Sequence, residues 1–191
     1  ITDWEPTALL REHDGAVRVV GADLRDGARG GVVMTLDPAD GGAAEHARFD
    51  LEAGRRVRVA WARPDTGWVV AGTPGLYDGV FARGLDAAGE REWNLRLGTA
   101  DRWLLRGHGT DGLGRYLLTG IAFRETPSSR YGYVASIDDR GRLRWLYGAT
   151  SWHLFGAVRP TGDGQWTAVG ARRRFVTDET WLYDTALMGL S

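Results

Sequence analysis

The feature that most constrains this chain is an internal repeat of roughly fifty residues. One glycine marks each of the four copies, and these glycines are Gly21, Gly72, Gly120 and Gly170, spaced 48 to 51 residues apart. Each glycine lies in an apolar segment that follows an Asp/Gly turn; the segments are 16–22, 67–73, 115–121 and 165–171. Since no helical spacing of apolar residues separates the copies, the repeat predicts a fold assembled from similar β units.

Within each repeat the sequence predicts four short strands. A second strand follows each glycine, at 31–37, 79–86, 132–138 and 184–191. A third strand carries Trp93 and Trp145 in equivalent places, with Phe49 standing in for them in the first copy, and a fourth leads to the next Asp/Gly turn. Four strands per repeat are typical of a β-propeller blade. Helical solenoids have similar periods, but they need a 3.6-residue periodicity and far fewer glycines.

We therefore predict an all-β fold, a single β-propeller domain over residues 1–191 with about four blades of four antiparallel strands. The repeats span approximately 1–51, 52–98, 99–148 and 149–191. The last repeat lacks its outer strand, and too few residues precede Trp4 to supply it. Because exposed strand edges invite pairing with another chain, we expect a protein partner or a second copy to cover the edge of 181–190. The alternative is a four-blade ring sealed within one chain, in which the outer strand is dispensable.

Two segments carry a resemblance to a known family. Residues 85–93 (LDAAGEREW) and 137–145 (IDDRGRLRW) resemble the tryptophan-docking repeat of PQQ-like propellers, and the Asp/Gly-x-Trp/Tyr segments resemble repeats of exported bacterial propeller proteins. The resemblance implies an extracellular or periplasmic location, and it implies that one strand of each blade lines the central axis. It implies no single activity, because such propellers serve as enzymes, lectins, scaffolds and assembly factors. The first repeat departs from the pattern, since it lacks the tryptophan.

Composition excludes several classes of function. The 24 basic and 25 acidic residues give a formal net charge of -1, which argues against a nucleic-acid-binding protein. No apolar run approaches the roughly 18 residues that a membrane span needs. Cysteine is absent, so disulfides, thiol nucleophiles and cysteine-ligated zinc are excluded.

The axial strand implied by the resemblance brings one arginine from each repeat toward the axis. These arginines are Arg11, Arg63, Arg106 and Arg159. Four guanidinium groups that converge would repel one another unless an anion or carboxylates neutralised them. We therefore predict an axial anion site, with the outer rim as the alternative location of these side chains.

The tryptophans divide into two groups. Those that recur at the blade period are predicted to be core residues: Trp68 and Trp166 with Tyr116, and Trp93 with Trp145. Trp4, Trp103 and Trp152 begin the axial strand, where exposed rings could stack on sugars; the alternative is that they too are core.

Histidines and acidic turns give weaker signals. His13 and His108 each precede an Asp/Gly turn, so they are either axial side chains or exposed turn residues. No histidine spacing fits a metal site, and the GxGxxG match at 107–112 leads into a repeat strand rather than a helix. The turns at 37–42 and 138–141 offer oxygen ligands for calcium, but turn chemistry explains them adequately. No cofactor is expected.

These features favour a non-catalytic binding or scaffold domain that mediates protein or ligand interactions. The alternative is a lectin-like module that binds carbohydrate in pockets between blades. A third reading is an enzyme, either a PQQ-type oxidoreductase or a glycan hydrolase. PQQ enzymes need larger rings and a calcium-plus-acid site that the sequence does not reveal, and a hydrolase needs paired carboxylates facing one cavity.

Overall fold

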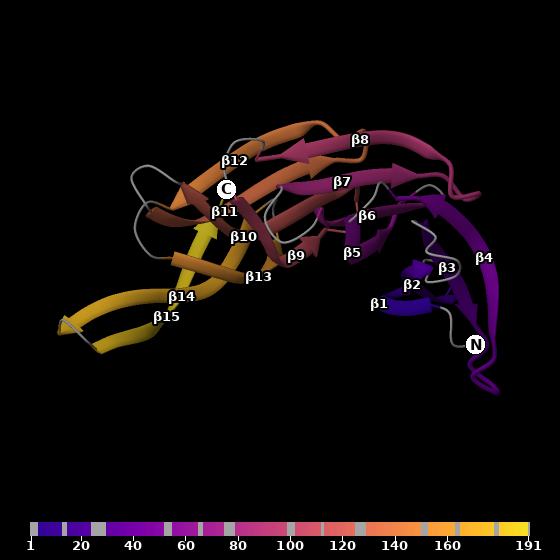
Figure 1. Ribbon diagram of the computed structural model, residues 1–191, viewed down its shortest axis with the longest axis horizontal. Helices are drawn as coiled ribbons and strands as arrows, with labels where there is room; N and C mark the ends of the chain where they lie inside the picture. The colour runs from indigo at the N-terminus through magenta and orange to yellow at the C-terminus, as the bar shows by residue number, and fades with distance from the viewer. Residues whose placement is uncertain are drawn as a thin grey trace. The chain divides into compact units, whose positions relative to one another are not determined.

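The protein is described by a computed structural model over residues 4–12, 15–23, 30–51, 55–64, 67–74, 79–98, 102–111, 113–124, 129–149, 153–162, 165–177 and 180–190. These residues form β-strands and turns (Figure 1), and in this part of the chain no helix is present that could cross a membrane. The strands group into four antiparallel sheets, which we number as blades 1 to 4.

Each predicted repeat contains one sheet. Blade 1 consists of β1 (Trp4–Arg11), β2 (Val17–Asp23), β3 (Gly30–Leu36) and β4 (Ala43–Asp50). Blade 2 consists of β5 (Arg55–Ala62), β6 (Trp68–Pro74), β7 (Val80–Leu85) and β8 (Arg91–Leu97). Blade 3 consists of β9 (Arg102–Thr110), β10 (Arg115–Arg124), β11 (Ser129–Asp138) and β12 (Leu143–Ala149). Blade 4 consists of β13 (His153–Gly162), β14 (Gln165–Thr177) and β15 (Thr180–Leu190).

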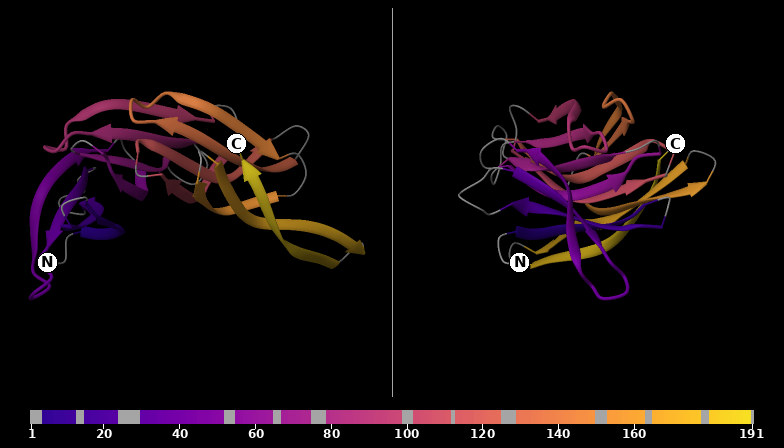
Figure 2. Two further views of the ribbon diagram at one scale, coloured as in Figure 1. Left: turned by 180° about the vertical axis from the view of Figure 1, so that it is seen from behind. Right: turned by 90° about the vertical axis from the view of Figure 1, so that its right-hand side faces the viewer.

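Consecutive strands are neighbours in every sheet, as Figure 2 shows from two further sides. The prediction of an all-β fold with four antiparallel blades, the last with three strands, is confirmed. β15 forms one edge of blade 4, and the covering of that edge by another chain stays a prediction.

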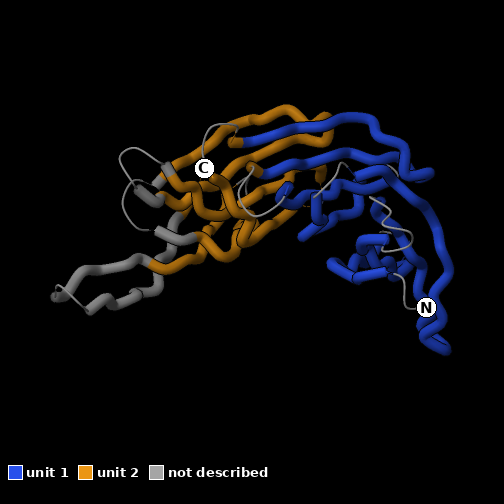
Figure 3. The backbone as a smooth tube through the Cα atoms, in the orientation of Figure 1, with its two compact units in different colours: residues 1–76, 80–97 blue, residues 77–79, 98–191 orange. Residues whose placement is uncertain are grey.

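The chain divides into two compact units (Figure 3). Unit 1 comprises residues 1–76 and 80–97 and contains blades 1 and 2; unit 2 comprises residues 77–79 and 98–191 and contains blades 3 and 4. Within unit 1, β1 lies beside β5, and within unit 2, β9 lies beside β13. The first strands of neighbouring blades therefore approach one another in both units. That residues 1–191 form a single domain stays a prediction.

The recurrent glycine has a structural reason. In the four blades it pairs with the first strand at Pro6, Val57, Leu105 and Phe155, and one extra residue follows each of these as a β-bulge. The bulge presses a carbonyl oxygen against the glycine: a Cβ added to Gly72 would lie 1.8 Å from the oxygen of Arg56. On Gly120 it would lie 1.8 Å from the oxygen of Leu104. No side chain fits there, so bulge and glycine recur together.

The Asp/Gly turns between the third and fourth strands also share one construction. Asp86 Oδ1 accepts hydrogen bonds from the amides of Ala88 at 2.9 Å and Glu90 at 2.8 Å. In blade 3, Asp138 Oδ1 accepts from Arg140 at 3.0 Å and Arg142 at 2.8 Å. Turn chemistry thus accounts for both carboxylates, since each replaces missing backbone partners.

Three of the recurrent aromatic residues form the core, as predicted. Trp68, Tyr116 and Trp166 hold equivalent positions, four residues before the recurrent glycine, and all are buried. They anchor the second strand of their blades. Trp68 also donates a hydrogen bond from Nε1 to Glu12 Oε1 at 2.9 Å, which joins blade 2 to blade 1.

Trp93 and Trp145, on the outer strands of blades 2 and 3, differ from the prediction that they are core residues. Trp93 and Trp145 do hold equivalent positions, opposite Gly84 and Ser136, but both are only half-buried. Phe49 does not replace them, because it pairs with Gly31 near the other end of β4. The first-blade residue in the tryptophan position is Ala44, opposite Thr35. The turn in blade 1 is one residue longer than that in blade 2, but β8 has a bulge at Glu92, so Ala44 follows Asp37 by seven residues as Trp93 follows Asp86.

Candidate functional site

The structure places the four predicted axial arginines in different settings. Arg11 and Arg159 are exposed, and Arg106 is exposed as the bulge residue of β9. Arg63 is buried and forms an ion pair with Glu92 on β8, the outer strand of its blade. Counted from the bulge, the four residues do not occupy equivalent positions, and two belong to each unit. The anion site stays a prediction.

The predicted stacking and axial residues are also in unlike settings. Trp103 is 5% exposed, with its ring centroid 4.4 Å from that of Tyr133, so it is a core residue in this structure. Trp4 is half-buried against Gly21. His108 lies on β9, where partial loss of hydration lowers its pKa below the usual value and the charge of Arg159 lowers it further. His13 and Trp152 lie outside the described residues.

A polar cleft of about 720 Å³ lies in unit 1, between blades 1 and 2. Blade 1 contributes the end of β2, the beginning of β3 and the end of β4, and blade 2 contributes β7 and the turn before β8. Its charged lining residues are Asp23, Arg48, Asp50, Arg83, Glu90 and Arg91. The cleft therefore has six charged lining residues, whereas the predicted axial site has four arginines.

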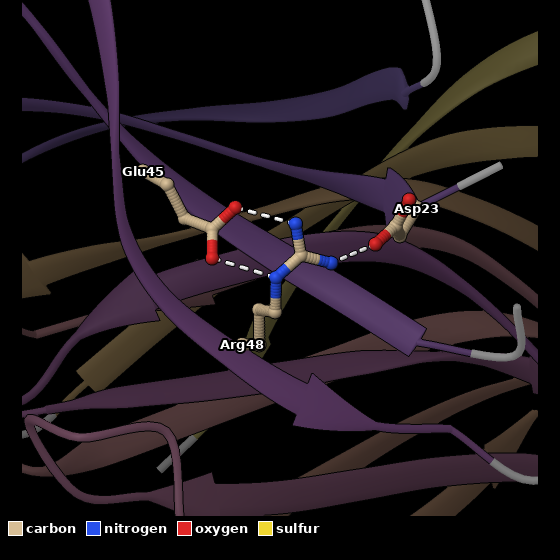
Figure 4. A network of polar contacts seen from close by, with 3 residues as sticks. All are labelled: Asp23, Glu45 and Arg48. Atoms are coloured by element: carbon tan, nitrogen blue, oxygen red, sulfur yellow. Dashed lines mark hydrogen bonds and ion pairs between the residues drawn. The ribbon is translucent and has the colours of Figure 1, made fainter. Parts of the chain in front are cut away.

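One side of the cleft is an ionic network centred on Arg48 (Figure 4). Arg48 Nε donates to Glu45 Oε1 at 2.6 Å, and Nη1 forms an ion pair with Asp23. Residues three apart in a regular strand point to opposite faces. A β-bulge at His46 inserts one extra residue between the paired positions of Glu45 and Ala47, and so brings Glu45 and Arg48 to the same face.

Arg83 forms the opposite wall. Its residue exposure is 2%, and its guanidinium lies 5.7 Å from the centre of the Phe81 ring. Nη1 donates to the backbone oxygen of Asp50 at 2.7 Å, and Nε donates to Asn94 Oδ1 at 3.1 Å. Because Asp50 belongs to blade 1 and Arg83 to blade 2, this side chain ties the two blades together beneath the cleft.

The turn of blade 2 packs directly on β4. Gly89 has φ +88, and a Cβ there would lie 2.3 Å from the backbone oxygen of Arg48. Only glycine combines that backbone conformation with so close an approach. Backbone packing at Gly89 and the Arg83 hydrogen bond thus hold blades 1 and 2 against each other at the cleft.

The lining offers both hydrogen-bond donors and acceptors. Three arginines and three carboxylates line the cleft, so the formal charges balance. In the described part of the chain, no group of three His, Cys, Asp or Glu side chains is placed to hold a metal ion. A larger depression of about 960 Å³, bordered by Arg11 and the β3–β4 turn, is lined by small residues such as Gly15 and Ala16 and by three charged side chains, against six in the cleft.

The repeat pattern did not identify the cleft residues, because Asp23, Arg48 and Arg83 are not at recurring positions. One signal was available. Arg83 stands in the middle of the apolar strand β7 (VFARGL), where a charged side chain needs a specific partner.

Comparison with known proteins gives a likeness of fold. No family model matches the chain, and no curated protein matches it in sequence. Hydrazine synthase from Kuenenia stuttgartiensis superposes with a TM-score of 0.66 at 14% identity, over 98% of this chain and 51% of that one. An α-L-arabinanase from Penicillium chrysogenum, solved with arabinobiose, gives 0.63 at 10% identity, over 100% of this chain and 63% of that one.

The fold is that of a β-propeller. A Bacteroides caccae protein of unknown function also matches, with a TM-score of 0.54 and 15% identity over 90% of this chain and 55% of that one. The chain therefore spans about half to two thirds of the length of these propellers. At such low identity the likeness shows the fold alone.

Proposed function

We propose that this propeller is a non-catalytic binding domain that takes a carbohydrate in the cleft between blades 1 and 2. The observation that carries the proposal is the balanced set of arginines and carboxylates around that cleft, in which Arg48, Asp23 and Arg83 are held by ion pairs and hydrogen bonds. A hydroxyl group both donates and accepts hydrogen bonds, so a polyhydroxylated ligand can use both kinds of side chain. A strongly charged ligand would instead meet equal numbers of like and opposite charges.

The cleft also has an apolar component. Phe49, Leu51 and Leu85 line it and are buried. Apolar walls with a few oriented polar groups are typical of small-ligand sites, and the C–H faces of a sugar ring suit such walls. The volume of about 720 Å³ falls in the usual range for such pockets.

Glycan hydrolysis is the second candidate, because the structural neighbours include an α-L-arabinanase and an α-L-arabinofuranosidase. A hydrolase uses two carboxyl groups that flank the scissile bond. In the cleft, Asp23 is engaged by Arg48, whereas Asp50 and Glu90 are exposed lining residues. We rank binding first because Asp50 and Glu90 are exposed, whereas the general acid of a glycosidase usually lies in an apolar, partly buried setting.

The test is a glycan array followed by calorimetry with each glycan that binds. Asp50→Asn and Arg91→Gln alter cleft side chains and leave the Asp50 carbonyl that Arg83 needs; each should weaken binding about tenfold, the loss of one charged hydrogen bond. Arg96→Gln, also on β8 but outside the cleft lining, is the matched control and should bind as wild type.

Two outcomes contradict the proposal. A wild-type protein that binds no glycan on the array would remove carbohydrate as the ligand. Release of reducing sugars from arabinan by the wild type, abolished in Asp50→Asn, would show a hydrolase instead.

We also propose that the protein is a PQQ-like propeller located outside the cytoplasm, as the resemblance of its repeats implies. This proposal is supported by the Asp-turn segments that end at Trp93 and Trp145, which hold equivalent places in blades 2 and 3. Fractionation of the native cells should find the protein outside the cytoplasm; recovery only with cytoplasmic markers would contradict this part.

A further inference from the structure

The outer strand of blade 3, β12, is an apolar sheet edge. It pairs with β11 on one side, and among the described residues no strand pairs with its other side. Three of its large hydrophobic side chains are exposed: Leu143 by 42%, Leu146 by 46% and Tyr147 by 41%. An edge of this kind presents unpaired backbone groups together with apolar side chains.

The equivalent strands of unit 1 are protected by charge. β8 exposes Arg91, Glu92, Asn94 and Arg96, and β4 exposes Glu45, His46, Arg48 and Asp50. Charged side chains on edge strands prevent unwanted pairing. On β12 the only charged residue is Arg144, near its beginning, so the strand lacks this protection from Trp145 onward.

Positive charge is concentrated at the beginning of β12. The single carboxylate oxygen Asp138 Oδ2 binds both Arg142 Nε at 2.8 Å and Arg144 Nε at 3.0 Å. Both arginine side chains are exposed, and residues 138–144 contain three arginines and two carboxylates, an excess of one positive charge. A chain lying along β12 would therefore meet excess positive charge at one end and apolar side chains along the rest.

We propose that β12 binds an extended segment of a partner protein, antiparallel to the strand, with alternating apolar residues and an acidic C-terminal end. Antiparallel pairing places that acidic end beside Arg142 and Arg144, and the apolar residues of the segment beside Leu146 on one face of the sheet. Such strand addition takes its affinity from backbone hydrogen bonds and its specificity from alternate side chains. The proposal is independent of the carbohydrate cleft, which lies in unit 1.

The probe is a fluorescent synthetic peptide of about nine residues, a usual strand length, in which valine and threonine alternate before a run of glutamates. A second peptide carries lysines in place of the glutamates. Fluorescence anisotropy should show at least about tenfold tighter binding of the acidic peptide, and added salt should reduce the difference. Leu146→Lys should weaken acidic-peptide binding about tenfold, because a charge on the edge opposes pairing.

The matched control is Leu113→Lys, the same substitution at a leucine that is 82% exposed in the turn before β10 and away from β12. This variant should bind the peptide as wild type does, and melting curves confirm that both variants fold. Equal affinity for the two peptides, or unchanged binding by Leu146→Lys, overturns the proposal. Light scattering that shows a wild-type dimer, lost in Leu146→Lys, also overturns it by assigning the edge to a second copy.

Discussion

β4 and β12 hold the same place in their blades but present different chemistry. Each is the outer strand, each follows an Asp turn, and each contains a β-bulge. β4 uses its exposed positions for the Arg48 network at the cleft, whereas β12 exposes Leu146 and Tyr147. The difference teaches that first and second strands maintain the fold, and that the outer strands are free to vary.

The largest expected effect on stability concerns the buried tryptophans of the second strands, and it tests whether second strands matter more for the fold than outer strands. Trp68→Ala in unit 1 and Trp166→Ala in unit 2 should each lower the free energy of unfolding by about 3–5 kcal/mol, the cost of emptying a buried aromatic site. Trp93→Ala, on an outer strand and half-buried, should cost about 2 kcal/mol. Urea unfolding of the three variants measures this, and an equal loss for Trp93→Ala would break the comparison.

The recurrent glycines test whether both units use the same framework. Gly72→Ala and Gly120→Ala should each cost about 3 kcal/mol, because the added Cβ meets a backbone oxygen that cannot move freely. Gly148→Ala on β12 is the control, since the nearest atom to its Cβ would be 3.6 Å away, in the Tyr131 ring. It should change stability by less than about 1 kcal/mol. A unit that tolerates alanine at the recurrent position does not depend on the bulge.

The ionic network on β4 should matter more than its counterpart near β12. Arg48→Ala removes a partner of Asp23, which is 4% exposed, and should cost about 2 kcal/mol. Arg144→Ala removes the ion pair between an exposed arginine and Asp138. Asp138 keeps Arg142 as a partner, so the loss should be about 0.5 kcal/mol. Thermal unfolding at matched ionic strength separates them, and equal losses would mean that the β4 network gives no added stability.

The smallest expected effect concerns the Asp138 turn. Burial raises the pKa of Asp138, but hydrogen bonds from the Arg142 amide and side chain and the Arg140 amide outweigh it, so its pKa lies below the usual 3.8. A carboxyl with a lowered pKa in the folded state stabilises the protein above its unfolded pKa, and this stabilisation disappears as pH falls through the folded pKa.

Asp138→Asn should therefore cost about 1 kcal/mol at pH 7, and the difference from wild type should shrink below about pH 4. Urea unfolding at neutral and acidic pH gives the comparison. A difference that stays constant down to about pH 2 would show that the carboxylate charge is not responsible.

The sequence predicted the blade architecture because its determinants recur. Gly72 and Gly120 tolerate no side chain, and Asp86 and Asp138 close similar turns, so the glycine appears in all four repeats and the turn in the first three. The cleft could not be predicted in the same way. Arg48 reaches Glu45 only because of a bulge, and Arg83 bonds a carbonyl 33 residues earlier in the chain. Neither contact leaves a periodic mark in the sequence.

The order of the strands also has a consequence for how the chain acquires its structure. Every strand pairs with its immediate neighbour in sequence, so a blade can form from about fifty consecutive residues without waiting for distant segments. Such local pairing favours rapid folding for an all-β protein, with blades forming in turn as the chain leaves the ribosome. The side chains that join one blade to the next, such as Trp68 and Arg83, would then engage last.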